Sequence, residues 1–143
     1  MLGFLFSIIA GAAMSLQGVM NTRLSDKVGM YESNLYCQGI AFILSLAAYF
    51  IMGNNGFATL TAVPKQYMFG GVLGLVITIT VMLGIKDLSP VVSISVILVS
   101  QLFVAALIEA LGALGTDKVS FGFLKIVGLV LMVAGIVVFK IKT

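Results

Sequence analysis

Five apolar runs, each long enough to cross a lipid bilayer, constrain this 143-residue chain more than any other feature. A hydrocarbon core of about 30 Å needs about 20 helical residues at about 1.5 Å each. Short polar segments separate the runs, which lie near 2–22, 31–53, 66–85, 90–112 and 121–140. Only 9% of the residues are charged, too few to cover a water-facing surface. The sequence therefore predicts an all-α membrane protein, a single domain of five transmembrane helices over residues 1–143.

The first run raises the question of a cleaved signal peptide. Ala10-Gly11-Ala12 resembles a signal-peptidase site. No Lys or Arg precedes this site, however, and the apolar run continues past it to Asn21. We therefore expect a retained first helix.

Eight Lys and Arg residues lie at the ends of the apolar runs, where cations anchor and orient membrane helices. They form no basic face, which disfavours nucleic-acid binding. Five crossings place Arg23, Lys27, Lys86, Lys140 and Lys142 on one side of the membrane, and Lys65, Lys118 and Lys125 on the other. This bias puts the C-terminus inside, but it is small. The sequence is therefore compatible with insertion in both orientations and antiparallel pairing.

Residues that usually carry catalysis or bind metals are scarce. The chain has no histidine and one cysteine, Cys37, so it lacks the commonest general base and the commonest metal ligand. Ser93, Ser95 and Ser100 have no histidine to activate them, and we interpret them as packing hydroxyls. The sequence therefore predicts no enzyme, no metal site and no cofactor.

Polar side chains gather on one face of each of the first two helices. On the first, Gln17 and Asn21 lie on the side with the smallest residues. On the second, spacings of three and four form one stripe of amides, hydroxyl and rings: Tyr31, Asn34, Gln38, Phe42, Ser45 and Tyr49. Such a stripe is typical of a cavity wall for a polar or cationic solute. It is equally typical of interhelical hydrogen bonds and interfacial tyrosines that need no ligand.

The fourth helix carries two polar side chains, Gln101 near its middle and Glu109 two turns later. Glu109 is the only acidic residue well inside a predicted crossing, and intramembrane carboxylates are costly and usually functional. One interpretation is a cation or proton-coupling site. The other is an interfacial partner of a Lys or Arg, and the sequence leaves both open.

Glycines on the third and fifth helices predict close packing. Gly70 and Gly74 belong to a ladder of small residues that permits the backbones of two helices to approach. Gly128 and Gly135 lie on an apolar face of the fifth helix. We expect that face to be a packing seam between subunits.

Three segments resemble a known family in order and spacing. They are Gln17-Gly18-Val19-Met20-Asn21 with Thr22-Arg23-Leu24, Phe69-Gly70-Gly71-Val72-Leu73-Gly74, and Gln101 followed by Leu107-Ile108-Glu109-Ala110-Leu111-Gly112. The chain resembles the YdcZ-type inner-membrane exporters of the drug/metabolite transporter superfamily. It departs from them at Glu109, where aspartate is more usual, and in the stripe around Gln38.

The resemblance implies a five-helix bundle equivalent to half of a ten-helix transporter in a bacterial inner membrane. Two antiparallel copies would rebuild the whole, with the solute bound near the midplane between inverted repeats. The chain is then expected to be a homodimeric small-solute exporter that works by alternating access. The expected solute-binding residues are Gln17, Asn21, Tyr31, Asn34, Gln38, Phe42 and Gln101, with Glu109 as the coupling or cation site. A non-transporting membrane subunit or assembly factor, and a passive channel, are the alternatives.

Overall fold

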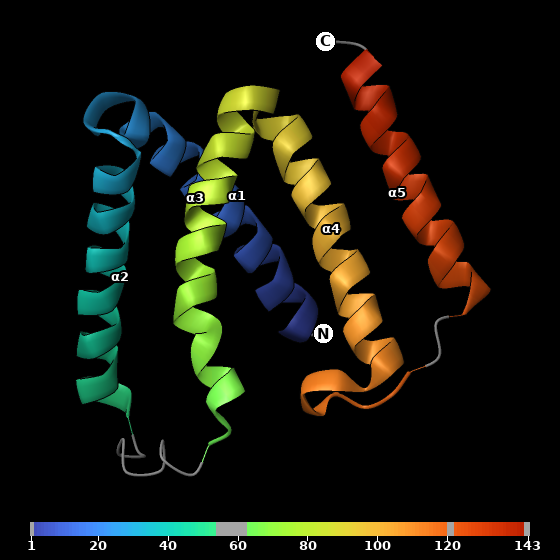
Figure 1. Ribbon diagram of the computed structural model, residues 1–143, viewed down its shortest axis with the longest axis horizontal. Coiled ribbons are helices and arrows are strands. Elements are labelled where there is room, and N and C mark those ends of the chain that lie inside the picture. Colours follow the sequence, from blue (N-terminus) through green and yellow to red (C-terminus); the bar gives the residue numbers. More distant parts are fainter. Residues whose placement is uncertain (1, 54–62, 120–121, 142–143) are drawn as a thin grey trace. The chain divides into compact units, whose positions relative to one another are not determined.

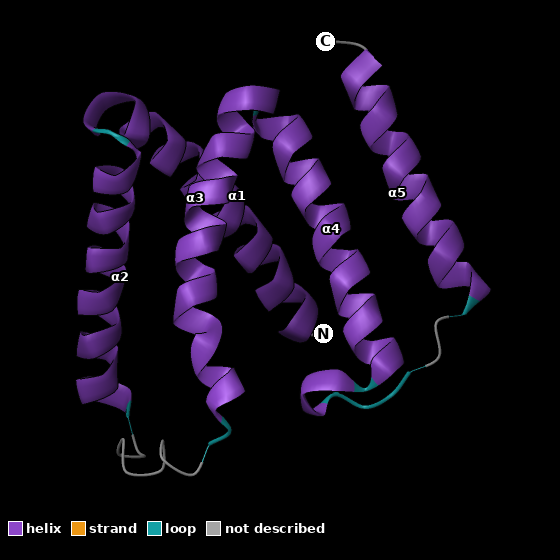
Figure 2. Ribbon diagram, viewed as in Figure 1, coloured by secondary structure: helices purple, strands orange, loops and turns teal. Residues whose placement is uncertain are grey.

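The computed structural model describes residues 2–53, 63–119 and 122–141, and every regular element in these ranges is a helix (Figure 1; Figure 2). The α-helices are α1 (Leu2–Val28), α2 (Met30–Met52), α3 (Gly70–Leu88), α4 (Pro90–Leu111) and α5 (Phe123–Ile141). Two short 3-10 helices, η2 (Lys65–Phe69) and η3 (Ala113–Gly115), precede α3 and follow α4. The predicted all-α fold is confirmed.

Four helical segments in the described part of the chain are long and apolar enough to cross a membrane. They are α1, α2, α4 and Lys65–Leu88, which joins η2 to α3. The shortest has 22 residues and extends about 33 Å, against a hydrocarbon core of about 30 Å. The apolar part of α5, Phe123–Phe139, is shorter, so a fifth crossing stays a prediction.

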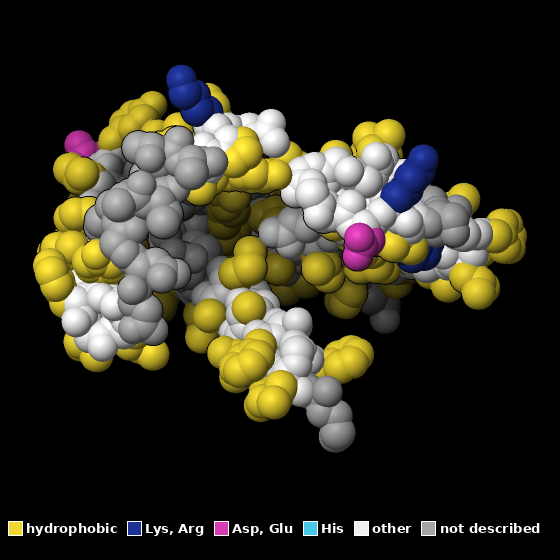
Figure 3. All heavy atoms as spheres, turned by 90° about the horizontal axis from the view of Figure 1, so that it is seen from below, with side chains coloured by type: hydrophobic (Ala, Val, Ile, Leu, Met, Phe, Trp, Pro, Cys, Tyr) yellow, Lys and Arg dark blue, Asp and Glu magenta, His cyan; other side chains and the backbone are white. Residues whose placement is uncertain are grey.

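Burial in this chain is the reverse of burial in a soluble protein. Among the described residues three apolar side chains are buried, Met82, Ile85 and Ala106. Six polar residues are buried as well: Asn21, Thr22, Ser25, Ser33, Asn34 and Ser93. Large hydrophobic side chains lie exposed along all five α-helices, and they cover much of the face seen in Figure 3. A lipid environment favours this pattern, because polar groups must find partners inside while apolar groups face the acyl chains.

The C-terminal end of α1 corrects the sequence prediction. We expected the first helix to end near residue 22 and residues 23–30 to connect it to the second, but α1 continues to Val28. The charges of Arg23, Asp26 and Lys27 mark the end of the apolar run, not the end of the helix. Arg23 and Lys27 are good helix formers, so the helix can continue past the apolar run, and this expectation was wrong by six residues.

A single residue, Gly29, joins α1 to α2. Its φ of 101° lies in a region that favours glycine. Its N–H donates to the Ser25 carbonyl and its own carbonyl accepts from the Ser33 N–H, both over 3.1 Å. The two helices therefore meet in a tight bend (Figure 1).

The other helix ends agree with the prediction more closely. α2 and α4 begin and end within one residue of the expected bounds, and α3 continues three residues past 85. Pro90 occupies the first position of α4 and Gly112, with φ 62°, caps its end, as expected for these residue types. The predicted start of the fifth helix at 121, the cation Lys142 and residues 54–62 of the second connection lie outside the described residues.

The chain divides into two compact units, Met1–Asp87 and Leu88–Thr143. In the first unit α1 packs on α2, and Gly18 of α1 faces Val81 and Ile85 of α3. In the second unit α4 packs on α5, and η3 lies against α4.

Candidate functional site

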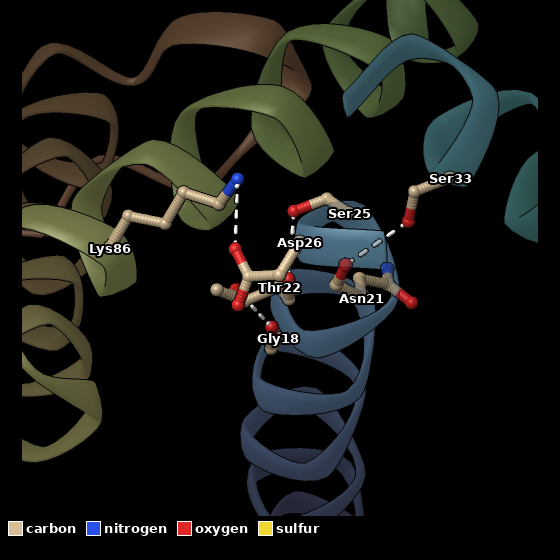
Figure 4. Close-up of polar contacts among 7 residues, drawn as sticks. All are labelled: Gly18, Asn21, Thr22, Ser25, Asp26, Ser33 and Lys86. Carbon is tan, nitrogen blue, oxygen red and sulfur yellow. Dashed lines mark hydrogen bonds and ion pairs between the residues drawn. The ribbon is translucent and has the colours of Figure 1, made fainter. Parts of the chain in front are cut away.

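Asn21 is the polar centre of the first unit. The Ser33 hydroxyl donates to the Asn21 backbone carbonyl over 3.0 Å (Figure 4). The Cys37 thiol donates to the Asn21 side-chain Oδ1 over 2.9 Å. Ser33 and Cys37 are four residues apart and so share one face of α2. Both bonds cross from α2 to α1, so they fix the position and the orientation of a buried amide.

Two hydroxyls beside Asn21 are satisfied within α1. Thr22 donates to the Gly18 carbonyl over 2.7 Å, and Ser25 donates to the Thr22 carbonyl over 2.8 Å (Figure 4). Both residues are buried. Because each hydroxyl proton is already donated to the helix backbone, these side chains support the packing of α1 and do not offer donors to a solute.

An ion pair joins the C-terminal ends of α1 and α3. Lys86 Nζ lies 3.1 Å from Asp26 Oδ1 (Figure 4). The lysine and aspartate side chains are 32% and 45% exposed. The pair brings Lys86 to the end of α1, while the side of the membrane on which these charges lie stays a prediction.

A small cavity lies in the seam between α1 and α3. Its volume is about 50 Å³, and its lining residues are Met14, Gln17, Gly18, Asn21, Ile77, Thr78, Val81 and Met82. The Thr78 hydroxyl donates to the Gly74 carbonyl over 2.8 Å. Small-molecule sites usually have volumes of about 300 Å³ or more. The seam is therefore nearly closed, although two of the predicted site residues, Gln17 and Asn21, line it together.

Asn34 and Gln38 lie one turn apart on α2. Asn34 is 6% exposed, and its Oδ1 is a buried acceptor without a hydrogen-bond partner in the described structure. Gln38 Nε2 lies 3.8 Å from the position that a Cβ on Gly74 would take, so this amide faces α3. Buried amide oxygens are rarely left unpaired, and each exception needs an explanation.

Two further members of the predicted set that belong to the first unit, Tyr31 and Phe42, do not line this seam. Tyr31 and Phe42 are 73% and 68% exposed. Gln101 is exposed on α4, in the second unit. Tyr49 packs edge to face against Phe50, with ring centroids 5.6 Å apart. A solute-contacting role for Tyr31, Phe42 and Gln101 stays a prediction.

Glu109 forms an ion pair in the second unit. Its Oε2 accepts a hydrogen bond from Lys125 Nζ over 3.2 Å, and the lysine and glutamate side chains are 44% and 47% exposed. The backbone carbonyl of Glu109 also accepts from the N–H groups of Gly112 and Val119, over 3.2 and 3.0 Å. The structure thus shows Glu109 as the partner of a basic residue, one of the two interpretations of its sequence position. A coupling role stays a prediction.

A larger cavity adjoins this ion pair between α4 and α5. It measures about 540 Å³ and is lined by Leu102, Phe103, Ala105, Ala106, Glu109, Lys125, Gly128, Leu129 and Met132. Its walls are apolar except at Glu109 and Lys125. Gln101, which the sequence grouped with Glu109, is not among the lining residues.

The glycines differ in how closely other helices approach them. Among the described glycines inside the α-helices, the tightest contact is at Gly18, where an added Cβ would lie 3.1 Å from Ile85 Cδ1 and 3.1 Å from Val81 Cγ1. Gly74 faces Gln38, whereas nothing lies within 4 Å of a Cβ at Gly70, Gly128 or Gly135. Within one chain these three helix surfaces are open, so their packing role stays a prediction about a neighbouring chain.

Sequence reasoning missed Ser33, Cys37 and the Asp26–Lys86 pair. Ser33 and Cys37 lie beside the predicted stripe of α2, and their four-residue spacing was a usable signal of a second polar face. The sequence predicts a connection between helices at Asp26, and this prediction gives no indication of the contact with Lys86.

A family model described as "Putative inner membrane exporter, YdcZ" matches residues 2–138. No curated protein and no solved structure matches the chain.

Proposed function

This chain belongs to the YdcZ family of inner membrane exporters, and we propose that it moves a small polar or cationic solute out across that membrane. The apolar helices fit a multi-pass protein of the inner membrane. The structural observation that carries the proposal is the buried, unpartnered Oδ1 of Asn34.

An unpartnered amide oxygen is costly, at about 1–3 kcal/mol. A solute that presents an N–H, an O–H or a cationic group would satisfy it. Gln38 faces Gly74 of α3, and Asn34 lies one turn before it on α2. Gln17 and Asn21 line the α1–α3 seam. The first unit therefore supplies four amide side chains for binding, and Tyr31, Phe42 and Gln101 are proposed to complete the site in the assembled transporter.

Solute entry would have to widen the α1–α3 seam. The present cavity of about 50 Å³ must grow to about 300 Å³ for a typical small molecule. Two features support such a movement. The Asp26–Lys86 pair is partly exposed and costs at most about 1 kcal/mol to separate. Gly29 joins α1 to α2 with one residue of positive φ, which gives α1 a point about which to tilt.

The functional unit in this proposal is an antiparallel homodimer. A five-helix chain is half of a ten-helix transporter, and inverted repeats bind solute at their interface and expose it to each side in turn. The open faces at Gly70 and Gly135 support association with a second copy. The weak charge bias of the sequence supports insertion in both orientations.

Glu109 is the proposed coupling residue. A proton or cation that binds the Glu109 carboxylate would have to compete with Lys125, whose Nζ lies 3.2 Å from Glu109 Oε2. Glu109→Gln should then abolish any proton dependence of export while the protein remains folded. Asp117→Asn is the matched control, because Asp117 is exposed in the connection after α4. Unchanged coupling in Glu109→Gln would remove this residue from the mechanism.

Counterflow tests the proposal against its alternatives. Purified chain in liposomes loaded with an unlabelled solute should accumulate the labelled solute transiently, because a carrier exchanges one for the other. The panel would contain choline and tetraethylammonium as cations and an uncharged polyol. Non-saturating flux without accumulation would indicate a passive channel. A second protein that co-purifies in fixed ratio, with no flux, would indicate a membrane subunit or assembly factor.

A further inference from the structure

The cavity between α4 and α5 has a polarity gradient along its length. Glu109 lies two residues before the end of α4, and Lys125 lies two residues after the start of α5. The two charged residues are therefore about 3 Å inside the helix ends, at the depth where lysine side chains reach the headgroups. From there the groove continues along Ala105 and Gly128 to Leu102 and Met132, about 10 Å further into the apolar region.

The charged end of the groove has unused bonding capacity. Lys125 has three N–H donors and Glu109 two carboxylate oxygens, and the structure shows one bond between them. Both side chains are nearly half exposed. An incoming group that carries both an anion and an ammonium could bond to each of them, because the pair presents opposite charges side by side.

The inner part of the groove is lined by small and apolar side chains. Its lining includes Ala105, Ala106 and Gly128, and no atom lies within 4 Å of a Cβ at Gly128. An acyl chain can lie against these residues, because its methylene groups need only apolar contacts.

We infer that this groove binds one phospholipid with an amine and phosphate headgroup, the chemistry of phosphatidylethanolamine. Its phosphate bonds to Lys125, its ammonium bonds to Glu109, and one acyl chain lies along Gly128 toward Met132. Pockets with basic residues between transmembrane helices are known to hold lipid headgroups. The groove contains none of the amide side chains of the first unit, although it shares Glu109 with the proposed coupling role. Because lipid binding is measured without export, the inference does not depend on whether the chain exports a solute.

The test is native mass spectrometry of the purified full chain titrated with phosphatidylethanolamine or with phosphatidylglycerol, which has no amine. Wild-type chain should bind the amine lipid at least about tenfold more tightly, since one charge-assisted hydrogen bond distinguishes the two lipids. Glu109→Gln should remove that preference, and Lys125→Gln should weaken the binding of both lipids. An ion pair that only stabilises the fold would not make Glu109→Gln affect one lipid and Lys125→Gln affect both.

Gly128→Leu tests the groove itself, and Gly135→Leu is its matched control. Both glycines lie on α5 with open space where a side chain would be added, but only Gly128 lines the cavity. Gly128→Leu should lower the affinity for phosphatidylethanolamine about tenfold, while Gly135→Leu leaves it unchanged. Equal binding of both lipids by wild-type chain, or unaltered binding in Gly128→Leu, would overturn the inference. Loss of dimer mass in Gly128→Leu with lipid binding intact would assign the groove to a second copy instead.

Discussion

The thiol of Cys37 donates a hydrogen bond to the side-chain amide oxygen of Asn21 over 2.9 Å. The bond links α2 to α1, and Asn21 also lines the cavity in the α1–α3 seam. Cys37 is the only cysteine in the sequence. It is therefore a natural probe of the proposed solute path.

Solute binding should protect Cys37 from modification. At a solute concentration about ten times its Kd, about nine tenths of the sites are filled, so the rate of reaction with a small methanethiosulfonate should fall about tenfold. The rate would be measured by mass spectrometry on chain in liposomes. Cys37→Ser is the control, because a serine hydroxyl can still donate to Asn21 while nothing remains to be modified. An unchanged rate at saturating solute would place the solute away from Asn21.

Gly18→Leu should loosen the packing of α1 on α3. A side chain there would meet Ile85 and Val81, whose atoms already lie 3.1 Å from an added Cβ. Overpacking of this kind lowers the free energy of unfolding by about 1–3 kcal/mol. Thermal unfolding in detergent would measure the loss. Gly11→Leu on the same helix has open space and should be neutral, and equal loss in both variants would mean that the α1–α3 contact is not the cause.

The Asp26–Lys86 pair should contribute little to stability. Both side chains are partly exposed, and such pairs are typically coupled by about 0.2–1 kcal/mol. A double-mutant cycle with Asp26→Asn and Lys86→Gln would measure the coupling, which should shrink at high salt. A coupling of several kcal/mol would show that the pair locks the seam and would argue against a seam that opens during export.

Cysteine labelling should reveal both orientations of the chain. In a Cys37→Ser background, a single cysteine added at the N-terminus should react with an impermeant maleimide from either side of the membrane, in comparable fractions. A cysteine added at the C-terminus should be labelled from the opposite side in each orientation, because the five proposed crossings would separate the two ends. Labelling from one side alone would contradict the antiparallel dimer.

Much of the fold follows from apolar run length. The limits of α2 and α4 could be predicted within one residue because polar residues flank those runs. The end of α1 could not be predicted in this way, because a helix can continue beyond its apolar residues as long as the residues that follow favour a helix. Charge at Arg23 and Asp26 marks the end of the apolar run, and the chain turns only at Gly29.

The sequence predicts which faces of the helices are polar, but it does not predict which residues on those faces contact one another. Helical spacing identified Asn21 and Asn34, both of which are buried. The same spacing included Tyr31 and Phe42, which are exposed, because a straight stripe on α2 need not be covered along its whole length. Helical spacing could not identify the partner of Glu109, because Lys125 lies on the next helix. Lys125 approaches Glu109 only because the chain reverses direction at Gly112, whose φ is 62°.

The measurement that tests the central claim most directly is solid-supported-membrane electrophysiology on the purified chain in liposomes, with choline, tetraethylammonium and an uncharged polyol applied in turn. The account predicts a saturable current evoked by at least one of the cations. That current should be lost in Asn34→Ala and kept in Leu35→Ala, a neighbouring residue that is 74% exposed. A saturable current of equal size in both variants would contradict the account, because solute would then be moving without the buried amide of α2.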